Sequence, residues 1–250
     1  MRPRLIPLLL FDNAHRLVKT VGFGRRTYIG DPFNVVRILN EKEVDEICIL
    51  DIDATVEGRK PDAGFIAELA SECFMPFAYG GGLSDLATCE TLNRAGVEKF
   101  VVSSAARTPG LLRELAATLG SQAVVGCVDV RGGLDGHCTV RSATQALAMS
   151  PVDYARQLED CGAGELLLQS VDGDGSRAGL DLRLIAGVAA GVGIPVIGAG
   201  GAGDVGDLIA GLRSGASAVA SGSAFSFVGR LRAVLVTYPD AATIAAAQTA

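Results

Sequence analysis

Glycine and serine residues at two places in the chain are suited to binding phosphate. An apolar, strand-like run ends in Gly80-Gly-Gly82 and is followed by Ser103-Ser104. A second such run ends in Gly200-Gly201 and is followed by Ser221-Gly-Ser223. Glycine turns after a strand expose backbone N–H groups, and such groups at the start of a helix bind anions. The phosphate-binding candidates are Gly81, Gly82, Ser103, Ser104, Gly200, Gly201, Ser221, Gly222 and Ser223. The alternative is that these glycines only form tight turns.

The two places repeat at one spacing, which favours phosphate binding over simple turns. The residue pairs that lie 119 positions apart are Pro76 and Pro195, Gly81 and Gly200, Asp85 and Asp204, Gly96 and Gly215, and Ser104 and Ser223. A repeat of half the chain is too long for a solenoid unit and indicates a duplicated half-domain. We expect half-domains at about residues 1–120 and 121–240. Two phosphate sites facing one opening predict a small molecule phosphorylated at both ends.

Carboxylates at strand ends are the candidates for acid–base chemistry. Asp129 ends an apolar strand, where it could act as a general acid or base. The duplication predicts a matching carboxylate at position 10, but that residue is Leu10. Asp12 either reaches back through a bulge to replace it or is a turn residue before Asn13.

Four more aspartates follow strands: Asp51, Asp53, Asp172 and Asp174. Some of them must cap loops through side-chain hydrogen bonds. We expect Asp174 to face the ligand.

Charged residues also begin four of the apolar strands: Arg4, Glu46, Lys99 and Glu165. Any one of them alone would be expected to point to solvent. If all four turn inward, they form a neutral ring of two cations and two anions. Buried charges persist only when they are paired, so such a ring predicts a plug or gate.

The elements that position these residues alternate from strand to helix along the whole chain. Strand-like segments are expected at 4–10, 46–52, 76–79, 99–103, 123–129, 165–171, 195–199 and 216–220. Eight βα units in about 250 residues predict a (β/α)₈ TIM barrel made of two half-barrels. A doubly wound sheet is the alternative, but its first βα turn would usually carry the glycines. The polar stretch from Asp12 to Gly30 is expected to be a functional flap or partly disordered, and a last helix is expected between Arg230 and Val236.

Composition excludes several classes of protein. The chain has 49% apolar residues and a mean hydropathy of +0.35, enough for a large core, yet no apolar run approaches a membrane span. A net charge of −6 without a basic run argues against nucleic-acid binding. Six cysteines stand singly and no signal peptide begins the chain, which predicts reduced thiols in a cytoplasmic protein. No metal or cofactor is expected.

The chain resembles the HisF family, the cyclase subunits of imidazole glycerol phosphate synthase. The resemblance runs from Arg4 to about Phe227. Its motifs are Val18-Lys19, Gly30-Asp-Pro32, Asp45-Glu-x-x-x-Leu-Asp51, Gly80-Gly-Gly82, Gly120-Ser-Gln122, Gly162-Ala-Gly-Glu165, Asp172-x-Asp-Gly175 and Gly200-Gly-Ala-Gly203.

The resemblance implies a partner and an ammonia path. In that family a HisH-like glutaminase subunit docks on the amino-terminal face of the barrel. Ammonia then passes a charged gate, matched here by Arg4, Glu46, Lys99 and Glu165, and reacts with a bis-phosphorylated substrate. The family's first-loop lysine matches Lys19 and its second catalytic aspartate matches Asp129, whereas its first aspartate is replaced by Leu10.

This departure separates three hypotheses. The chain looks closest to a HisF-like paralogue of surface-polysaccharide clusters, which supplies ammonia to a sugar amidotransferase that makes acetamidino sugars of lipopolysaccharide. Alternatively, it is a working cyclase of histidine biosynthesis in which Asp12 substitutes for the lost aspartate. A third hypothesis is a non-catalytic subunit that only activates its glutaminase.

Overall fold

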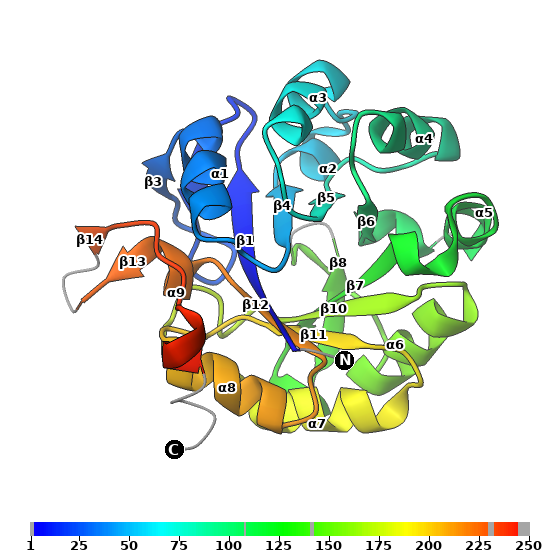
Figure 1. Cartoon of the computed structure of the whole chain (residues 1–250). Coiled ribbons are helices and arrows are strands. Elements are labelled where there is room, and N and C mark those ends of the chain that lie inside the picture. The colour runs from blue at the N-terminus through cyan, green and yellow to red at the C-terminus, as the bar shows by residue number, and fades with distance from the viewer. Residues whose placement is uncertain (1–2, 108, 141–142, 230–232, 245–250) are drawn as a thin grey trace.

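Eight parallel strands close into a barrel in the computed structural model of the chain (Figure 1). The structure describes residues 3–107, 109–140, 143–229 and 233–244. The barrel strands are β1 (Arg4–Phe11), β4 (Ile47–Asp51), β5 (Phe77–Gly80), β6 (Lys99–Val102), β7 (Val124–Arg131), β10 (Glu165–Ser170), β11 (Val196–Ala199) and β12 (Ala218–Ser221). Strand β12 pairs with β1 and β10 pairs with β7, so the sheet has no open edge among these eight strands. The predicted (β/α)₈ fold is confirmed.

Helices surround the barrel between consecutive strands (Figure 1). They are α1 (Pro32–Glu41), α2 (Ala54–Glu57), α3 (Ala63–Ser71), α4 (Leu86–Arg94), α5 (Pro109–Leu119), α6 (Pro151–Asp160), α7 (Leu182–Gly191), α8 (Val205–Arg213) and α9 (Ser223–Ser226), with short 3₁₀ turns η1 (Ser104–Arg107), η2 (Ser121–Ala123) and η3 (Gly133–Asp135). Aspartate or serine side chains cap several of these helices; Asp31, for example, accepts a hydrogen bond from the amide of Asn34. Within the described residues, none of the helices combines the length and apolar character that crossing a membrane requires.

The two halves of the chain place their elements at the same spacing. Helix α8 begins and ends 119 residues after α4, and β12 begins and ends 119 residues after β6. Asp85 and Asp204 cap α4 and α8 in the same way, each through the amide three residues on. The halves therefore repeat one pattern of elements around the barrel.

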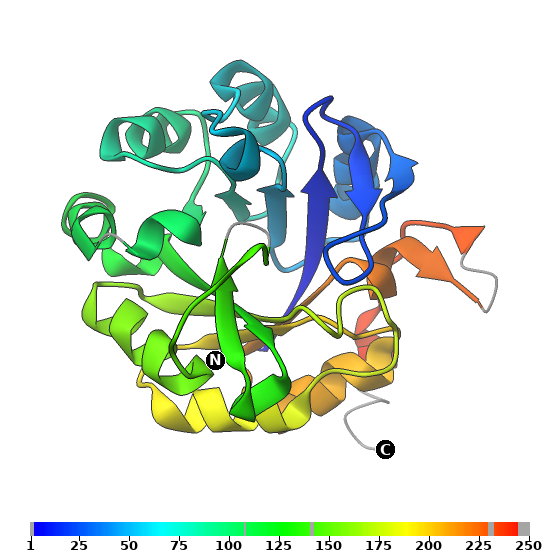
Figure 2. The same ribbon diagram turned by 180° about the vertical axis from the view of Figure 1, so that it is seen from behind.

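Two hairpins extend the barrel strands at their carboxyl ends (Figure 2). Strands β2 (Leu17–Lys19) and β3 (Thr27–Gly30) occupy part of the long polar stretch after β1, and β2 pairs antiparallel with β1. Strands β8 (His137–Val140) and β9 (Gln145–Ala146) extend β7. The stretch after β1 is thus a folded flap.

The end of the chain differs from the prediction of a helix between Arg230 and Val236. Residues 230–232 lie outside the described part, but β13 (Phe227–Val228) and β14 (Ala233–Val234) pair antiparallel. The hairpin stands away from the barrel beside α9 (Figure 1). The prediction was wrong because Gly229 adopts a positive φ of 72° and turns the chain, and because Val234 and Val236 are β-branched and favour extended backbone.

Side-chain alternation along the strands separates two apolar layers. On β1, Leu5, Leu9 and Phe11 pack against the helices, whereas Ile6, Leu8 and Leu10 face the barrel interior. Successive side chains of a strand point to opposite faces, so Arg4 shares the inner face with Leu10. The same alternation places the charged residues that begin four of the strands at one end of the interior and the last inward residues of those strands at the other.

Candidate functional site

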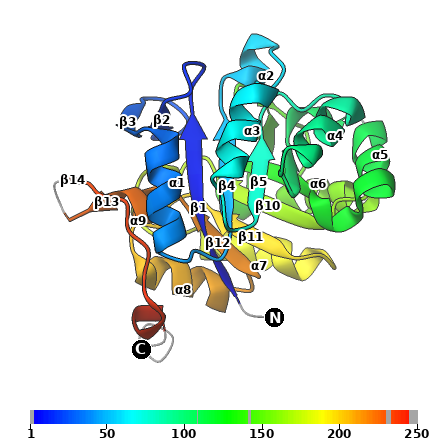
Figure 3. The same cartoon turned by 45° about the horizontal axis from the view of Figure 1, so that its top comes forward.

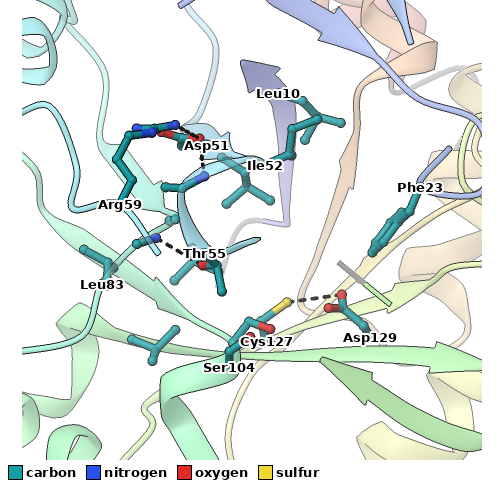
Figure 4. Close-up of a pocket in the computed structure, with 18 of the residues that line it drawn as sticks. Leu10, Phe23, Asp51, Ile52, Thr55, Arg59, Leu83, Ser104, Cys127 and Asp129 are labelled. Atoms are coloured by element: carbon teal, nitrogen blue, oxygen red, sulfur yellow. Dashed lines mark hydrogen bonds and ion pairs between the residues drawn. The ribbon is translucent and has the colours of Figure 1, made fainter. Parts of the chain in front are cut away.

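A cavity of about 510 Å³ opens at the carboxyl ends of the strands, where active sites of TIM barrels lie (Figure 4). Residues of β1, β4, β5, β6, β7 and β10 and of the turns that follow them surround it. Its lining includes Leu10, Phe23, Leu50, Asp51, Ile52, Gly80, Gly81, Gly82, Leu83, Val101, Ser103, Ser104, Cys127, Asp129 and Gln169. The structure therefore brings the first predicted phosphate-binding set and Asp129 into one cavity.

The first glycine turn approaches β4 too closely for any larger residue. Gly81 has φ +118°, and a Cβ atom built on it would lie 2.4 Å from the carbonyl oxygen of Asp51. At Gly82 the φ is +67°, and its amide donates to Thr55 Oγ1 at 3.2 Å. The turn is thus shaped by glycine, and one of its N–H groups has a protein partner.

Replacing Gly81 by Ala is expected to lower the free energy of unfolding by roughly 3 kcal/mol, because a Cβ atom both clashes with backbone and strains a left-handed φ. Urea unfolding measures the change. Gly110, where no atom lies within 4 Å of an added Cβ, is the matched control. Equal effects of the two alanines would contradict this account of the turn.

The second phosphate-binding set surrounds a much smaller cavity of about 20 Å³. Gly200, Gly201, Ser221, Gly222 and Ser223 line it together with Lys19 and Asp174. Ser221 Oγ donates to the carbonyl of Ala202 and accepts from the amide of Ala224, both at 3.1 Å. The buried Ser223 hydroxyl has no hydrogen-bond partner in the described part of the chain.

The Lys19 side chain packs against Gly222 in this second set. A Cβ atom on Gly222 would lie 3.0 Å from Lys19 Cδ. Lys19 Nζ donates to Asp174 Oδ1 at 2.6 Å, and Thr20 Oγ1 and the amide of Phe23 donate to Asp174 Oδ2. Asp174 therefore anchors the middle of the flap, between β2 and β3, and it lines the cavity of the second phosphate-binding set.

Asp129 is a buried carboxyl group on the inner face of β7. Cys127, two residues earlier on the same face, donates its thiol to Asp129 Oδ1 at 3.4 Å. Burial raises the pKa of Asp129 to about 6, and the negative charge of Asp174 adds to the increase. A carboxyl group with this pKa can exchange a proton near neutral pH.

Asp129→Asn is expected to stabilise the protein in alkaline but not in acidic solution. A carboxyl whose folded pKa is raised above its unfolded value of 3.8 favours folding below that value, and this contribution is lost as pH rises through about 6. The free energy of unfolding of the variant, relative to that of wild type, should therefore rise by about 3 kcal/mol when the pH is raised from about 4 to about 8. Urea unfolding at the two pH values measures this, and a pH-independent difference would contradict a shifted Asp129.

Leu10 occupies the position that the duplication assigns to a second carboxylate. It lies on the inner face of β1, lines both cavities and sits across the pocket from Asp129 in Figure 4. Asp12 lies beyond the end of β1 and binds its own turn: Oδ1 accepts from the amides of Ala14 and Arg16, and Oδ2 from the Arg16 guanidinium at 2.7 Å. Burial opposes ionisation, but these hydrogen bonds outweigh it and lower the pKa of Asp12.

The remaining strand-end aspartates hold loops. Asp51 accepts from the amides of Asp53 and Ala54 and from Arg59. Asp53 pairs with Arg26 at 2.8 Å, and Asp172 accepts from the amide of Gly132. These contacts fit the expectation that some of the four aspartates cap turns.

Among the cavity residues that were not predicted, two lie beside Asp129. Cys127 and Gln169 face inward beside Asp129, and Gln169 lies opposite Asp129 in the β7–β10 register. The available signal was alternation: each is a polar or thiol side chain at an inward position of an otherwise apolar strand. The 119-residue repeat could not indicate Gln169, because the corresponding position in the first half of the chain is Leu50.

The four charged residues meet in a ring at the opposite end of the barrel. Arg4 Nη1 lies 2.5 Å from Glu46 Oε2, and Arg4 Nη2 donates to Glu165. Lys99 Nζ lies 2.9 Å from Glu46 Oε2 and 2.9 Å from Glu165 Oε2. Each glutamate thus binds both cations, and the ring is neutral.

Apolar side chains continue from this ring toward the mouth. A cavity of about 10 Å³ lies directly inside the ring, lined by Glu46, Cys48 and inward-facing aliphatic residues. This is near the smallest volume that holds one water-sized molecule. Beyond it, the barrel interior is built from the aliphatic and thiol side chains of all eight strands.

Known proteins are similar to this chain over nearly its whole length. A family model described as "Histidine biosynthesis protein" matches residues 5–231. A Pseudomonas aeruginosa protein, named provisionally as imidazole glycerol phosphate synthase subunit hisF2, is 47% identical over 244 residues, which cover 96% of this chain and 97% of that protein. A similarly named HisF protein of Leptospira interrogans is 40% identical over 245 residues and 96% of each chain. The imidazole glycerol phosphate synthase subunit HisF of Thermobifida fusca is 36% identical over 232 residues and 90% of each chain.

Proposed function

Because the chain belongs to the histidine biosynthesis protein family, as a HisF-type barrel, we propose that it receives ammonia from a glutaminase and passes it through the barrel. The ammonia would supply amidination of an N-acetyl sugar in lipopolysaccharide biosynthesis. The observation that carries the proposal is the combination of a complete charged ring with a mouth that has Leu10 where a second carboxylate is expected.

The ring supports ammonia entry at the amino-terminal face, where a HisH-like glutaminase subunit would dock. Two carboxylates and two cations exclude solvent ions by being fully paired, yet a neutral molecule of ammonia's size fits the cavity directly inside. Ammonia binds the inner cavity next to Glu46 and then meets only weakly polar side chains. Between the ring and Asp129, this lining offers no group that would protonate ammonia, since burial raises the pKa of the Cys48 and Cys127 thiols and makes them poor acids.

The mouth supports delivery more than ring closure. Cyclisation with bond cleavage needs one group to give a proton and another to take it, and the residue across the mouth from Asp129 is Leu10, which can do neither. Asp12 is held by Arg16, and Lys19 is held by Asp174. The acceptor enzyme, a sugar amidotransferase, would then activate the sugar amide, while the barrel contributes a protected path.

The second candidate function is the cyclase reaction on a bis-phosphorylated ribulosyl precursor. It is favoured by the pKa of about 6 of Asp129, which suits acid–base catalysis, and by the names of the relatives. Both glycine turns would bind its phosphates after Lys19 leaves the second one.

The two functions differ in the product. The purified chain is mixed with a HisH-like glutaminase, glutamine, and either the imidazole precursor or the N-acetyl sugar with its amidotransferase. Amidination that depends on this chain supports ammonia delivery. Steady formation of imidazole glycerol phosphate would assign the cyclase function instead.

A further inference from the structure

The ring residues Arg4 and Glu46 lie at a seam of the barrel. In the described part of the chain, the β1–β4 ladder begins at Leu8, opposite Cys48. The earlier residues of β1 pair on their other side with β12, from Arg4 opposite Ala218. Backbone pairing between β1 and β4 therefore stops before it reaches the ring.

Side chains bridge this seam in place of the ladder. The amide of Leu5 donates to Asp45 Oδ2 at 3.1 Å. The hydroxyl of Tyr238 lies 2.9 Å from the same carboxylate oxygen and 3.0 Å from the carbonyl oxygen of Leu5. A hydroxyl donates one proton, and the carboxylate is the stronger of these two acceptors. Tyr238 thus touches the neighbours of both Arg4 and Glu46.

The segment before Tyr238 is held from the other end of the barrel. The Tyr238 ring stacks on the buried ring of Phe225 with centroids 5.4 Å apart. The amide of Thr237 donates to the carbonyl of Phe225 at 2.9 Å, and that of Leu235 to Ser226 at 3.0 Å. Figure 3 shows this segment running from α9 past α1 to the end of the barrel where β1 begins. Tyr238 therefore reaches the seam from an anchored position.

We propose that Tyr238 is a positioning residue for the charged ring: it closes the β1–β4 seam through Leu5 and Asp45, and so holds Arg4 and Glu46 in register with Lys99 and Glu165. Its role as part of an ammonia gate rests on the function proposed above. Its effect on the ring itself does not, and can be measured on the isolated protein.

Two buried thiols report on the two ends of the interior. Cys48 lines the small cavity directly inside the ring, and Cys127 lines the cavity at the mouth. Each lies alone in a tryptic peptide, residues 43–59 and 114–131, so mass spectrometry follows their labelling separately. Opening of the ring should expose Cys48 and leave the access to Cys127 from the mouth unchanged.

The test is the rate at which methyl methanethiosulfonate labels the two thiols in Tyr238→Phe, which loses the hydroxyl but keeps the stacked ring. Cys48 labelling should accelerate on the order of 10-fold, as expected for losing a hydrogen bond to a charged group, with Cys127 unchanged. Tyr28→Phe, at a tyrosine that is 60% exposed, is the matched control and should change neither rate. Asp45→Asn should change Cys48 labelling in the same direction.

Two results would overturn the proposal: an unchanged Cys48 rate in Tyr238→Phe, or equal acceleration of Cys48 and Cys127, which indicates general loosening. In the reconstituted complex, Tyr238→Phe should also lower the ratio of glutamine-driven to ammonium-driven transfer. If wild type shows no glutamine-driven transfer, the proposed function fails, whereas the labelling still decides the role of Tyr238.

Discussion

Glu165→Ala is expected to reduce glutamine-driven amidination on the order of 10²-fold, because ammonia that leaks at the ring is diluted from the roughly millimolar effective concentration of a linked site. Transfer driven by added ammonium salts should persist, since the path above the ring is intact. Glu165 binds both Arg4 and Lys99, so its loss leaves two cations to share Glu46. The assay compares initial rates with the two nitrogen sources.

The same substitution costs stability, which the controls must separate from transport. An uncompensated buried charge destabilises by roughly 3 kcal/mol, so Glu165→Ala is compared with the Lys99→Met, Glu165→Ala double variant, which keeps the remaining Arg4–Glu46 pair neutral. Glu114→Ala, at an exposed glutamate of α5, should affect neither nitrogen source. A gate role is excluded if glutamine-driven transfer by folded Glu165→Ala remains at the wild-type rate.

Leu10→Asp is expected to create cyclase activity on the bis-phosphorylated imidazole precursor. The new carboxylate would face the mouth across from Asp129 and could supply the missing proton transfer, typically worth on the order of 10²–10⁴-fold. Leu10→Asn has nearly the same shape but cannot ionise, and it should stay inactive. Formation of imidazole glycerol phosphate is followed with ammonium as the nitrogen source.

The Leu10→Asp substitution is also expected to destabilise the protein in a pH-dependent way. Leu10 is only 6% exposed, and the carboxylate that replaces it adds a second negative charge near Asp129. The Leu10→Asp variant should therefore lose stability, most strongly above the pKa of the pair. If the wild-type chain forms imidazole glycerol phosphate as fast as Leu10→Asp does, then Leu10 does not limit the cyclase reaction.

The 119-residue repeat, the apolar strand runs and the residue types at their ends carried most of the sequence prediction. In the structure Arg4 and Leu10 lie six positions apart along β1 and share its inner face, with Arg4 at the ring and Leu10 at the mouth. Gly81 and Gly200 allowed the two turns to be predicted, because only glycine is compatible with the φ values and close backbone contacts at these positions.

Other features depend on contacts between distant segments, which spacing does not encode. Nothing near Lys19 in the sequence indicates that its side chain packs against Gly222 and binds Asp174. The sequence allows two roles for Asp12, and its ion pair with Arg16 is visible only in the structure. Tyr238 contacts Asp45, a residue 193 positions earlier in the chain. The segment that leads to Tyr238 follows a hairpin and not the helix that was predicted.

The most direct test of ammonia delivery traces the nitrogen. The chain, a HisH-like glutaminase and a sugar amidotransferase are incubated with glutamine carrying heavy nitrogen in its amide, in the presence of excess unlabelled ammonium and both candidate acceptors. We expect heavy nitrogen in the amidino group of the sugar, little dilution by ammonium, and loss of this label with Glu165→Ala. Heavy nitrogen in imidazole glycerol phosphate, or an amidino group that carries only the unlabelled nitrogen, would contradict ammonia delivery to the sugar.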